Sequence, residues 1–295
     1  MKQLAIIGPT ASGKSDLAIS IAQKMDAYIL SIDSLSIYKE IDIVAAKPSK
    51  EDLATVKHFG IDTLYPNEHF SVELFIQLYK DVCKACQNDH KNLIIVGGTS
   101  FYLKSLLEGL SPLPKITQEI QQRVAKKLQD LKSAYEELST HDPLTMQKIA
   151  PSDRYRIEKN LLIYEASGMP PSQWFCEHPP KPVITDLPIY NIDVNRSLLR
   201  QRIEQRTHKM YAMGLIDEVC YLEQKYTRKP NAMKSIGIVE VLAFVDGKID
   251  KKEMLQLITT HTAQLAKRQQ TFNKTQFSDI ITAPLEELQK IILKR

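Results

Sequence analysis

The residues with the clearest chemical meaning are Gly8 to Ser15, which read GPTASGKS and satisfy the pattern GxxxxGK[ST]. They directly follow an apolar run, residues 4–7, so that strand, glycine loop and helix start come in the order that a phosphate-binding loop requires. Successive backbone N–H groups of such a loop can point at one anion, and the following helix adds its positive end. We therefore expect a phosphorylated ligand, with Lys14 on its outer phosphate and Ser15 holding Mg²⁺. The loop alone leaves open whether this ligand is a nucleotide.

A carboxylate and a threonine follow the next two apolar runs. Asp33 comes directly after residues 27–32, and Thr99 comes two glycines after residues 93–96. In an open parallel sheet the carboxyl ends of the strands share one edge with the phosphate loop. Asp33 can therefore serve the chemistry, or it can simply cap the next turn. Many ATPases place a Mg²⁺-organising Asp after such a run. Because Gly97 stands there, motor-type and switch-type NTPases are disfavoured, whereas small-molecule kinases remain.

Basic residues gather late in the chain, where residues 191–295 carry 18 Lys and Arg against 12 Asp and Glu. This excess suits a polyanion such as nucleic acid, although a solvated helical surface gives the same count. Arginines near a phosphate loop commonly neutralise a departing phosphate, and the alternative is a surface paired with acids such as Glu204. The long last helix adds Lys267 and Arg268. The arginines in question lie on a predicted helix with spacings of four: Arg196, Arg200, Arg202 and Arg206.

The elements that must position these residues follow from the apolar pattern. Three short runs separated by helical patterns, residues 4–7, 27–32 and 93–96, predict the parallel strands of an α/β core. Residues 72–86 predict an amphipathic helix, and residues 189–194 predict a fourth strand. The interval between two proline clusters is helical throughout, and its apolar face is formed by Ile116, Ile120, Val124, Leu128 and Leu131.

We therefore predict a P-loop NTPase-like parallel sheet core with an inserted all-helical domain. The core comprises residues 1–112 and 188–295, and the insertion comprises residues 113–187. The composition, with 43% hydrophobic and 25% charged residues, is typical of a soluble enzyme. No apolar stretch is long enough for a membrane span, so we expect a cytoplasmic protein without a membrane partner. Cys83 and Cys86 form a lone CxxC in a helical pattern, which favours free thiols over a zinc site.

Further short segments follow the phosphate loop in a fixed order. They are SIDS (31–34), IYKEIDI (37–43), AAKP (45–48), FSVELF (70–75), IIVGGTSFYLKSLLEGL (94–110), DP (142–143), PSDRYR (151–156), RIEQR (202–206), SIG (235–237) and LAKRQ (265–269). Together with GPTASGKS they resemble the tRNA dimethylallyltransferases, also called tRNA isopentenyltransferases or the IPP transferase family, in a short bacterial-type form. The likeness is specific, because many enzymes share the loop but not the later series.

The resemblance implies transfer of a dimethylallyl group from dimethylallyl diphosphate to N6 of the adenosine just 3′ of the tRNA anticodon. It makes Asp33, Thr99 and Arg206 catalytic. The exocyclic amine is a weak nucleophile that must lose a proton, which a carboxylate can accept, and the arginine would meet the departing diphosphate. With Mg²⁺ at Ser15, the loop would bind this diphosphate rather than ATP, through Gly8, Pro9, Thr10, Ala11, Ser12, Gly13, Lys14 and Ser15.

The resemblance also implies that the target adenine leaves the anticodon-loop stack and that the helical insertion grips the loop. The chain departs from the family pattern at Val44 to Pro48, at Ile238 and Val239, at Ala263 and at Phe272. The expected partners are a tRNA anticodon stem-loop and dimethylallyl diphosphate, and we expect a monomer. The expected tRNA-binding residues are Asp33, Ser34, Leu35, Ser36, Tyr155, Arg156, Ile157, Glu158, Lys159, Lys234, Gly237, Lys267, Arg268 and Gln269.

Two other functions use the same residues. A small-molecule or nucleoside kinase would need the phosphate loop, an arginine face and an aspartate at the sheet edge. An RNA-binding P-loop protein without turnover would need only the loop and the basic surface. Asp33 and Arg206 argue mildly against a protein without turnover.

Overall fold

A computed structural model describes residues 1–294. The chain folds as two compact units. The first combines Met1–Leu106 with the chain from Ile184 onward, and the second is Leu107–Val183. In the first unit the Ile184 N–H donates a hydrogen bond to the Leu106 carbonyl (3.1 Å). The two ends of the inserted segment are therefore tied together there, by one residue that precedes the first proline cluster and one that follows the second.

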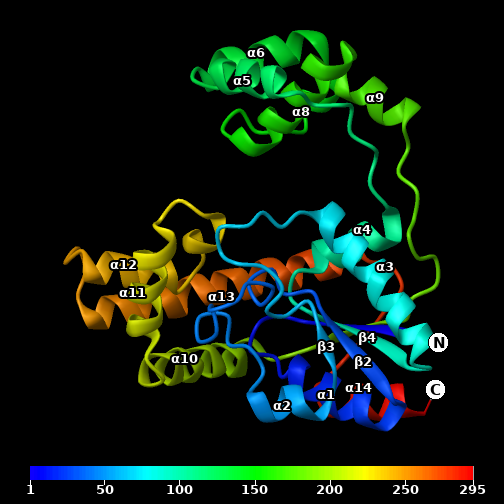
Figure 1. Ribbon diagram of the computed structural model, residues 1–295, viewed down its shortest axis with the longest axis vertical. Coiled ribbons are helices and arrows are strands. Elements are labelled where there is room, and N and C mark those ends of the chain that lie inside the picture. The colour runs from blue at the N-terminus through cyan, green and yellow to red at the C-terminus, as the bar shows by residue number, and fades with distance from the viewer. Residues whose placement is uncertain (295) are drawn as a thin grey trace. The chain divides into compact units, whose positions relative to one another are not determined.

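The first unit is built on a six-stranded, all-parallel sheet with strand order β3-β2-β4-β1-β5-β6 (Figure 1). The predicted parallel core is confirmed. Two edge strands were missed, because β3 has only two residues and β6 is half exposed and contains a polar Thr282. The strands are β1 (Gln3–Ile7), β2 (Ala27–Ser31), β3 (His58–Phe59), β4 (Asn92–Gly97), β5 (Ile189–Ile192) and β6 (Ile280–Ala283).

The register of the central strands decides which loops meet. Ile7 lies opposite Gly97 on β4 and opposite Asn191 on β5, so the loop after β1 leaves the sheet beside the end of β4. Ser31 on β2 lies opposite Val96 on the other side of β4. The segments that follow β1, β2 and β4 therefore emerge as neighbours at one edge, where ligands of open parallel sheets bind.

Helices cover both faces of this sheet, which is why its central strands are almost wholly apolar. In Figure 1, α3 and α4 lie above the sheet, whereas α1 and α14 lie below it. On the lower side, Leu17 and Ile21 of α1 share one hydrophobic cluster with Leu288 and Ile292 of α14. These covering helices, with the short α2, are α1 (Lys14–Met25), α2 (Lys50–Thr55), α3 (Val72–Asn88), α4 (Ser100–Glu108) and α14 (Leu285–Leu293).

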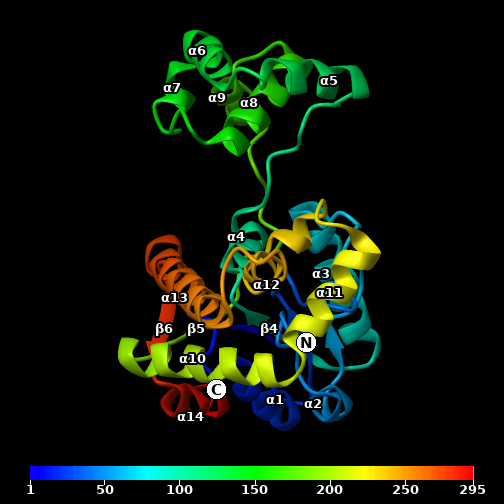
Figure 2. The same ribbon diagram turned by 90° about the vertical axis from the view of Figure 1, so that its left-hand side faces the viewer.

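A second layer of helices packs beside the sheet and carries most of the late basic residues. Figures 1 and 2 show α10 and α13 side by side, and Leu199 and Ile203 of α10 pack against Ala266 of α13. A larger cluster joins this layer to the loop that follows β2, through residues such as Ile41 and Val44. The layer consists of α10 (Arg196–Ala212), α11 (Leu215–Tyr226), a 3₁₀ turn (Asn231–Lys234), α12 (Ile238–Val245) and α13 (Lys251–Gln276).

The second unit contains only helices within its described residues. Its core includes the predicted face of Ile120, Val124 and Leu128, but this face is shared by two helices, because Asp130 caps a new helix at Leu131. The helices are α5 (Gln118–Lys127), α6 (Leu131–His141), α7 (Pro143–Met146), α8 (Arg154–Ser167) and α9 (Pro171–Glu177).

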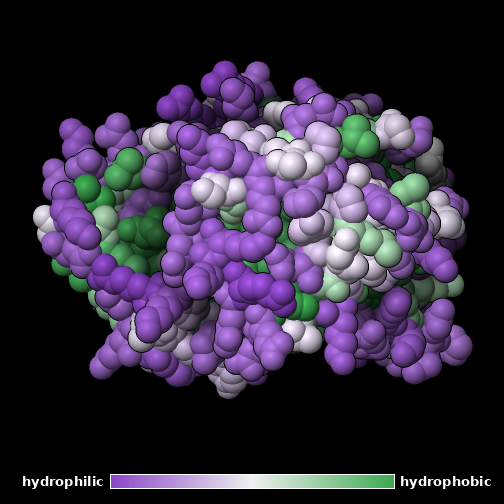
Figure 3. Space-filling model, turned by 90° about the horizontal axis from the view of Figure 1, so that it is seen from above, coloured by the Kyte–Doolittle hydropathy of each residue, from purple (hydrophilic) through white to green (hydrophobic). Residues whose placement is uncertain are grey.

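Most of the molecular surface in Figure 3 is hydrophilic, with hydrophobic residues gathered in a hollow at the left of that view. Within residues 1–294, no helix combines the length and the apolar character needed to cross a bilayer.

Candidate functional site

The phosphate loop connects β1 to α1 and has the geometry that its glycines predicted. Gly13 has φ +87°, a backbone conformation that favours glycine, and a Cβ there would also lie 2.7 Å from Cδ1 of Leu285. The helix begins at the next residue, Lys14. Its free N–H groups and positive end therefore face the sheet edge. A small cavity of about 60 Å³ lies against the loop and is lined by Thr10, Lys14, Ser15, Asp33 and Arg206 among others.

Lys14 is a half-buried cation that lines this cavity. Burial lowers the pKa of its ammonium group to about 8; the nearby Asp33 carboxylate opposes this change, and Arg206 adds to it. The Nζ atom donates one long hydrogen bond, to the carbonyl oxygen of Pro9 (3.3 Å). A half-buried ammonium group with so little compensation is stabilised by any anion that enters the cavity.

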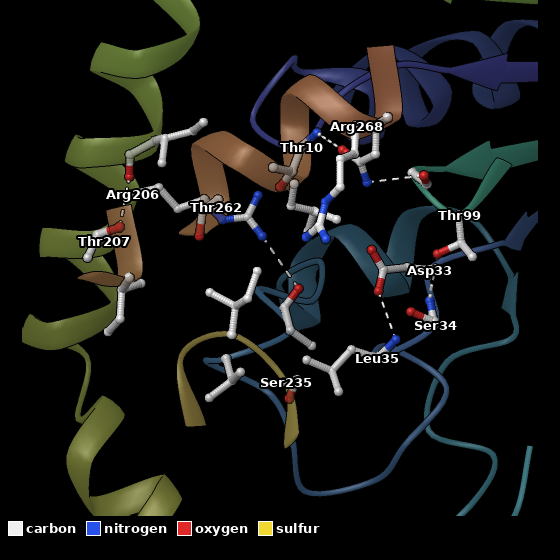
Figure 4. Close-up of a pocket in the computed structure, with 18 of the residues that line it drawn as sticks. Thr10, Asp33, Ser34, Leu35, Thr99, Arg206, Thr207, Ser235, Thr262 and Arg268 are labelled. Atoms are coloured by element: carbon white, nitrogen blue, oxygen red, sulfur yellow. Dashed lines mark hydrogen bonds between the residues drawn. The ribbon is translucent and has the colours of Figure 1, made fainter. Parts of the chain in front are cut away.

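Asp33 caps the turn after β2 and also lines the cavity. Its Oδ1 accepts hydrogen bonds from the N–H groups of Leu35 (2.9 Å) and Ser36 (3.3 Å), so it caps the turn after β2. Among the described residues, Oδ2 has no hydrogen-bond partner. Figure 4 shows the carboxylate directed into a cavity that Arg206 and Arg268 enter from other sides. One oxygen therefore fixes the side chain, and the other is available to a ligand.

Thr99 lies beside this turn because β4 and β2 are neighbours in the sheet. Its Oγ1 accepts a hydrogen bond from the Ser34 N–H (3.2 Å), and the side chain lines the same cavity (Figure 4). Since the hydroxyl acts as an acceptor there, its own proton can still be donated to a ligand.

Arg206 lines the small cavity at the phosphate loop and also a larger cavity next to it. Burial lowers the pKa of its guanidinium group, and the Asp33 carboxylate opposes this change. Its one hydrogen bond among the described residues is long, from Nη2 to the Ala45 carbonyl (3.5 Å). Arg202 reaches the Ser12 carbonyl at a similar distance (3.5 Å). The other two arginines of α10, Arg196 and Arg200, are exposed and line none of the cavities described here.

A second, larger cavity of about 410 Å³ lies next to the phosphate loop, and its wall is polar at one end and mostly apolar elsewhere. Polar groups stand at the end near the loop, where Thr10, Asp33, Thr99 and Arg206 meet. The rest of the wall is mostly apolar. It includes Val44, Ile203, Met210, Ile236, Ile258, Leu265 and Phe272. Such a cavity fits a ligand whose anionic group sits at the loop and whose remaining part is apolar or aromatic.

The loop that closes this site is held by a residue that the sequence did not reveal. Glu218, in the first turn of α11, accepts hydrogen bonds from three successive backbone N–H groups: those of Asp42 (3.0 Å), Ile43 (2.7 Å) and Val44 (2.9 Å). Nearby, the buried Lys47 donates to the Tyr38 carbonyl (2.7 Å) and pairs with two aspartates. No local pattern marks Glu218, since its partners lie far away in the chain.

The expected tRNA-binding residues of the first unit lie in different surroundings. Ser34, Leu35, Arg268 and Gln269 line the 410 Å³ cavity, and the buried Ser36 lines the smaller one. Lys234 and Lys267 are exposed but line neither cavity. The prediction that Gly237 contacts tRNA is wrong, because Gly237 is buried and its N–H donates a hydrogen bond to the Glu240 carboxylate (2.6 Å).

On the helical unit, the expected RNA face lies at the start of α8. Tyr155 is 69% exposed, Arg156 and Lys159 are exposed, and Glu158 is half-buried. Lys159 Nζ lies 5.5 Å from the Tyr155 ring centroid. The prediction that Ile157 contacts tRNA is also wrong, because its side chain is fully buried in the helical core and cannot touch RNA. Helical spacing alone turns this one residue of the five inward.

The structure also locates the residues at which the chain departs from the family pattern. Val44, Ala45 and Phe272 line the 410 Å³ cavity, so these changes alter its wall. Ala263 packs against the cluster that joins α10 to α13. Ile238 is buried, whereas Val239 is exposed.

The role of Glu218 can be measured. Glu218→Ala removes three hydrogen bonds to one carboxylate, so we expect the free energy of unfolding to fall by about 2 kcal/mol and the 41–48 loop to become sensitive to limited proteolysis. Asp217→Ala is the matched control, because it removes an exposed acid from the same helical turn. Equal effects of the two substitutions on denaturant unfolding and proteolysis would contradict this role.

Comparisons with known proteins agree with these features. A family model described as IPP transferase matches residues 36–276. The chain is 62% identical over 293 residues to the tRNA dimethylallyltransferase of Sulfurimonas denitrificans, covering 99% of each protein. It is 40% identical over 293 residues to that of Helicobacter pylori, covering 99% of this chain and 94% of the relative.

Solved structures give the same result. A tRNA delta(2)-isopentenylpyrophosphate transferase from Staphylococcus epidermidis aligns with a TM-score of 0.70 and 28% identity, covering 100% of this chain and 98% of the other. A eukaryotic dimethylallyltransferase acting on tRNA aligns with a TM-score of 0.84 and 25% identity, covering 97% and 74%. The family match spans most of the chain and the relatives match it end to end, so this protein belongs to the IPP transferase family.

Proposed function

We propose that this protein is a transferase that moves a dimethylallyl group from dimethylallyl diphosphate to N6 of the adenosine 3′-adjacent to the tRNA anticodon. The products are N6-dimethylallyladenosine and diphosphate. The names of the relatives support this function. The observation that carries it is the largely apolar cavity directly beside the phosphate loop, with Asp33 and Arg206 where the two meet. A tRNA substrate implies action in the cytoplasm, and we propose a monomer.

The donor fits this arrangement with its charged end at the loop. The diphosphate would contact the N–H groups of residues 8–15, together with Lys14 and Arg206, and the five-carbon group would enter the apolar cavity. The Ser15 hydroxyl lines the small cavity, and such a hard oxygen ligand suits Mg²⁺. When bound there, Mg²⁺ would neutralise part of the diphosphate charge.

The transfer is a substitution at C1 of the dimethylallyl group. The adenosine N6 forms a bond to this carbon while the bond from C1 to the diphosphate oxygen breaks. The N6 proton passes to Oδ2 of Asp33, the oxygen that the turn leaves available. Thr99, whose proton is not used by the turn, would orient the base or the diphosphate. Lys14 and Arg206 stabilise the negative charge that grows on the leaving group.

A kinase would use the same loop but is not favoured. The relatives are prenyl-transferring enzymes by name, and much of the cavity wall beside the loop is apolar, which suits a hydrocarbon group better than a small hydroxylated acceptor. A direct test is mass spectrometry of nucleosides from tRNA incubated with the enzyme and dimethylallyl diphosphate. We expect N6-dimethylallyladenosine. Phosphoryl transfer from ATP without any prenylated nucleoside would overturn the proposal.

The pKa of Lys14 predicts how donor binding depends on pH. Its cation binds the diphosphate, and with a pKa of about 8 it loses its proton above that pH in the free enzyme. We therefore expect the dissociation constant for dimethylallyl diphosphate, measured by calorimetry, to be flat from pH 7 to 8 and to rise about tenfold per unit above pH 8. Lys14→Gln should bind weakly with no such rise. A flat wild-type profile up to pH 9.5 would refute this assignment.

Asp33 can be tested by separating its two roles. Asp33→Asn keeps an oxygen that caps the turn but removes the proton acceptor, whereas Asp33→Ala removes both. We expect both variants to lose about 10²–10⁴-fold in single-turnover rate, while affinity for an anticodon stem-loop changes only a few-fold. If Asp33→Asn retains the wild-type rate and only Asp33→Ala loses it, the carboxylate serves as a cap and not as a base.

A further inference from the structure

One side-chain amide on α13 joins three elements of the site. The Oε1 atom of Gln269 accepts a hydrogen bond from the Thr10 N–H of the phosphate loop (2.8 Å). Its Nε2 atom donates to the Gly98 carbonyl at the end of β4 (3.1 Å). Both polar ends of the amide are therefore occupied by backbone groups of the protein, so its polar groups serve the protein rather than an RNA.

These bonds continue to the turn that carries Asp33. Gly98 precedes Thr99, whose Oγ1 accepts from the Ser34 N–H. Ser34 directly follows Asp33 in the chain. Hydrogen bonds and adjacent residues thus connect Thr10 in the phosphate loop, through Gln269, with Asp33 on the other side of the cavity.

The fit around the amide is close. A Cβ on Gly98 would lie 2.4 Å from Nε2 and 3.2 Å from Cδ of Gln269, and the three atoms nearest to it all belong to this amide. Glycine at this position therefore lets the amide lie against the backbone of the β4 end. The next residue along the helix toward its start, Arg268, instead points into the cavity (Figure 4).

We propose that Gln269 is a positioning residue for the transfer. It fixes the separation between the loop that holds the leaving diphosphate and the turn that holds Asp33, so that both stay aligned on the reacting carbon. This inference rests on the proposed prenyl transfer. Displacement of a reacting group by about 1 Å can cost about 10²-fold in rate, whereas loss of an RNA contact would weaken tRNA binding instead.

The test is to break the two hydrogen bonds and compare rate with affinity. For Gln269→Ala we expect the single-turnover rate at saturating substrates to fall about 10–100-fold, with the stem-loop dissociation constant within twofold of wild type. Gln264→Ala is the matched control, because Gln264 is an exposed glutamine on the same helix. It should match the wild type in both measurements.

Gly98→Ala provides a second variant that leaves Gln269 in place. Its new methyl group should displace the amide and reproduce the loss of rate. Because both changes break the same bonds, the double variant Gly98→Ala/Gln269→Ala should be no slower than about the slower single variant. Thermal unfolding by circular dichroism checks that each variant is folded.

The outcomes distinguish the two proposals. An inactive wild type overturns the proposed function and this inference with it. An active wild type overturns the inference alone in either of two cases: if Gln269→Ala keeps its rate but loses stem-loop affinity, or if the losses of the two single variants multiply in the double variant. A loss of rate at unchanged affinity, not additive with Gly98→Ala, supports it.

Discussion

The structure depends on the partial burial of positive charge beside the phosphate loop. Lys14 and Arg206 are both half-buried, desolvation lowers the pKa of each, and Asp33 is the carboxylate that opposes the change. Two cations and one anion leave a positive balance, which is costly in a protein interior unless a ligand supplies negative charge. A diphosphate is such a ligand. The site therefore favours an anionic ligand.

Such a site is stable only if the loops around it are held firmly. The phosphate loop, the 42–44 segment and the segment after β4 have no regular secondary structure. Side chains from distant parts of the chain hold them in place. Glu218 of α11 binds three N–H groups of the 42–44 segment, Lys47 ties the same loop to its neighbours, and Gln269 of α13 joins the phosphate loop to the end of β4. The helical layer therefore serves the site as much as the sheet does.

The residues next to the charged end of the cavity determine which kind of acceptor the site suits. In a kinase the groups beside a phosphate loop must orient a polar acceptor, whereas here Val44, Ile203, Met210 and Phe272 form an apolar wall. This wall suits a short hydrocarbon group and the face of a base. Asp33 stands at the border between the two environments, where one oxygen is fixed by the turn and the other is the proton acceptor in the proposed transfer.

The sequence by itself determined the phosphate loop, the parallel core, the helical character of the insertion and the family, because these depend on local patterns: glycine spacing, apolar runs and ordered motifs. Only the tertiary structure decided the rest. It showed that Asp33 both caps and faces the cavity, that Ile157 and Gly237 are buried, and that Glu218 and Gln269 hold the loops. These contacts join residues that are far apart in the chain, and the strand register and helix packing that bring them together leave no local pattern.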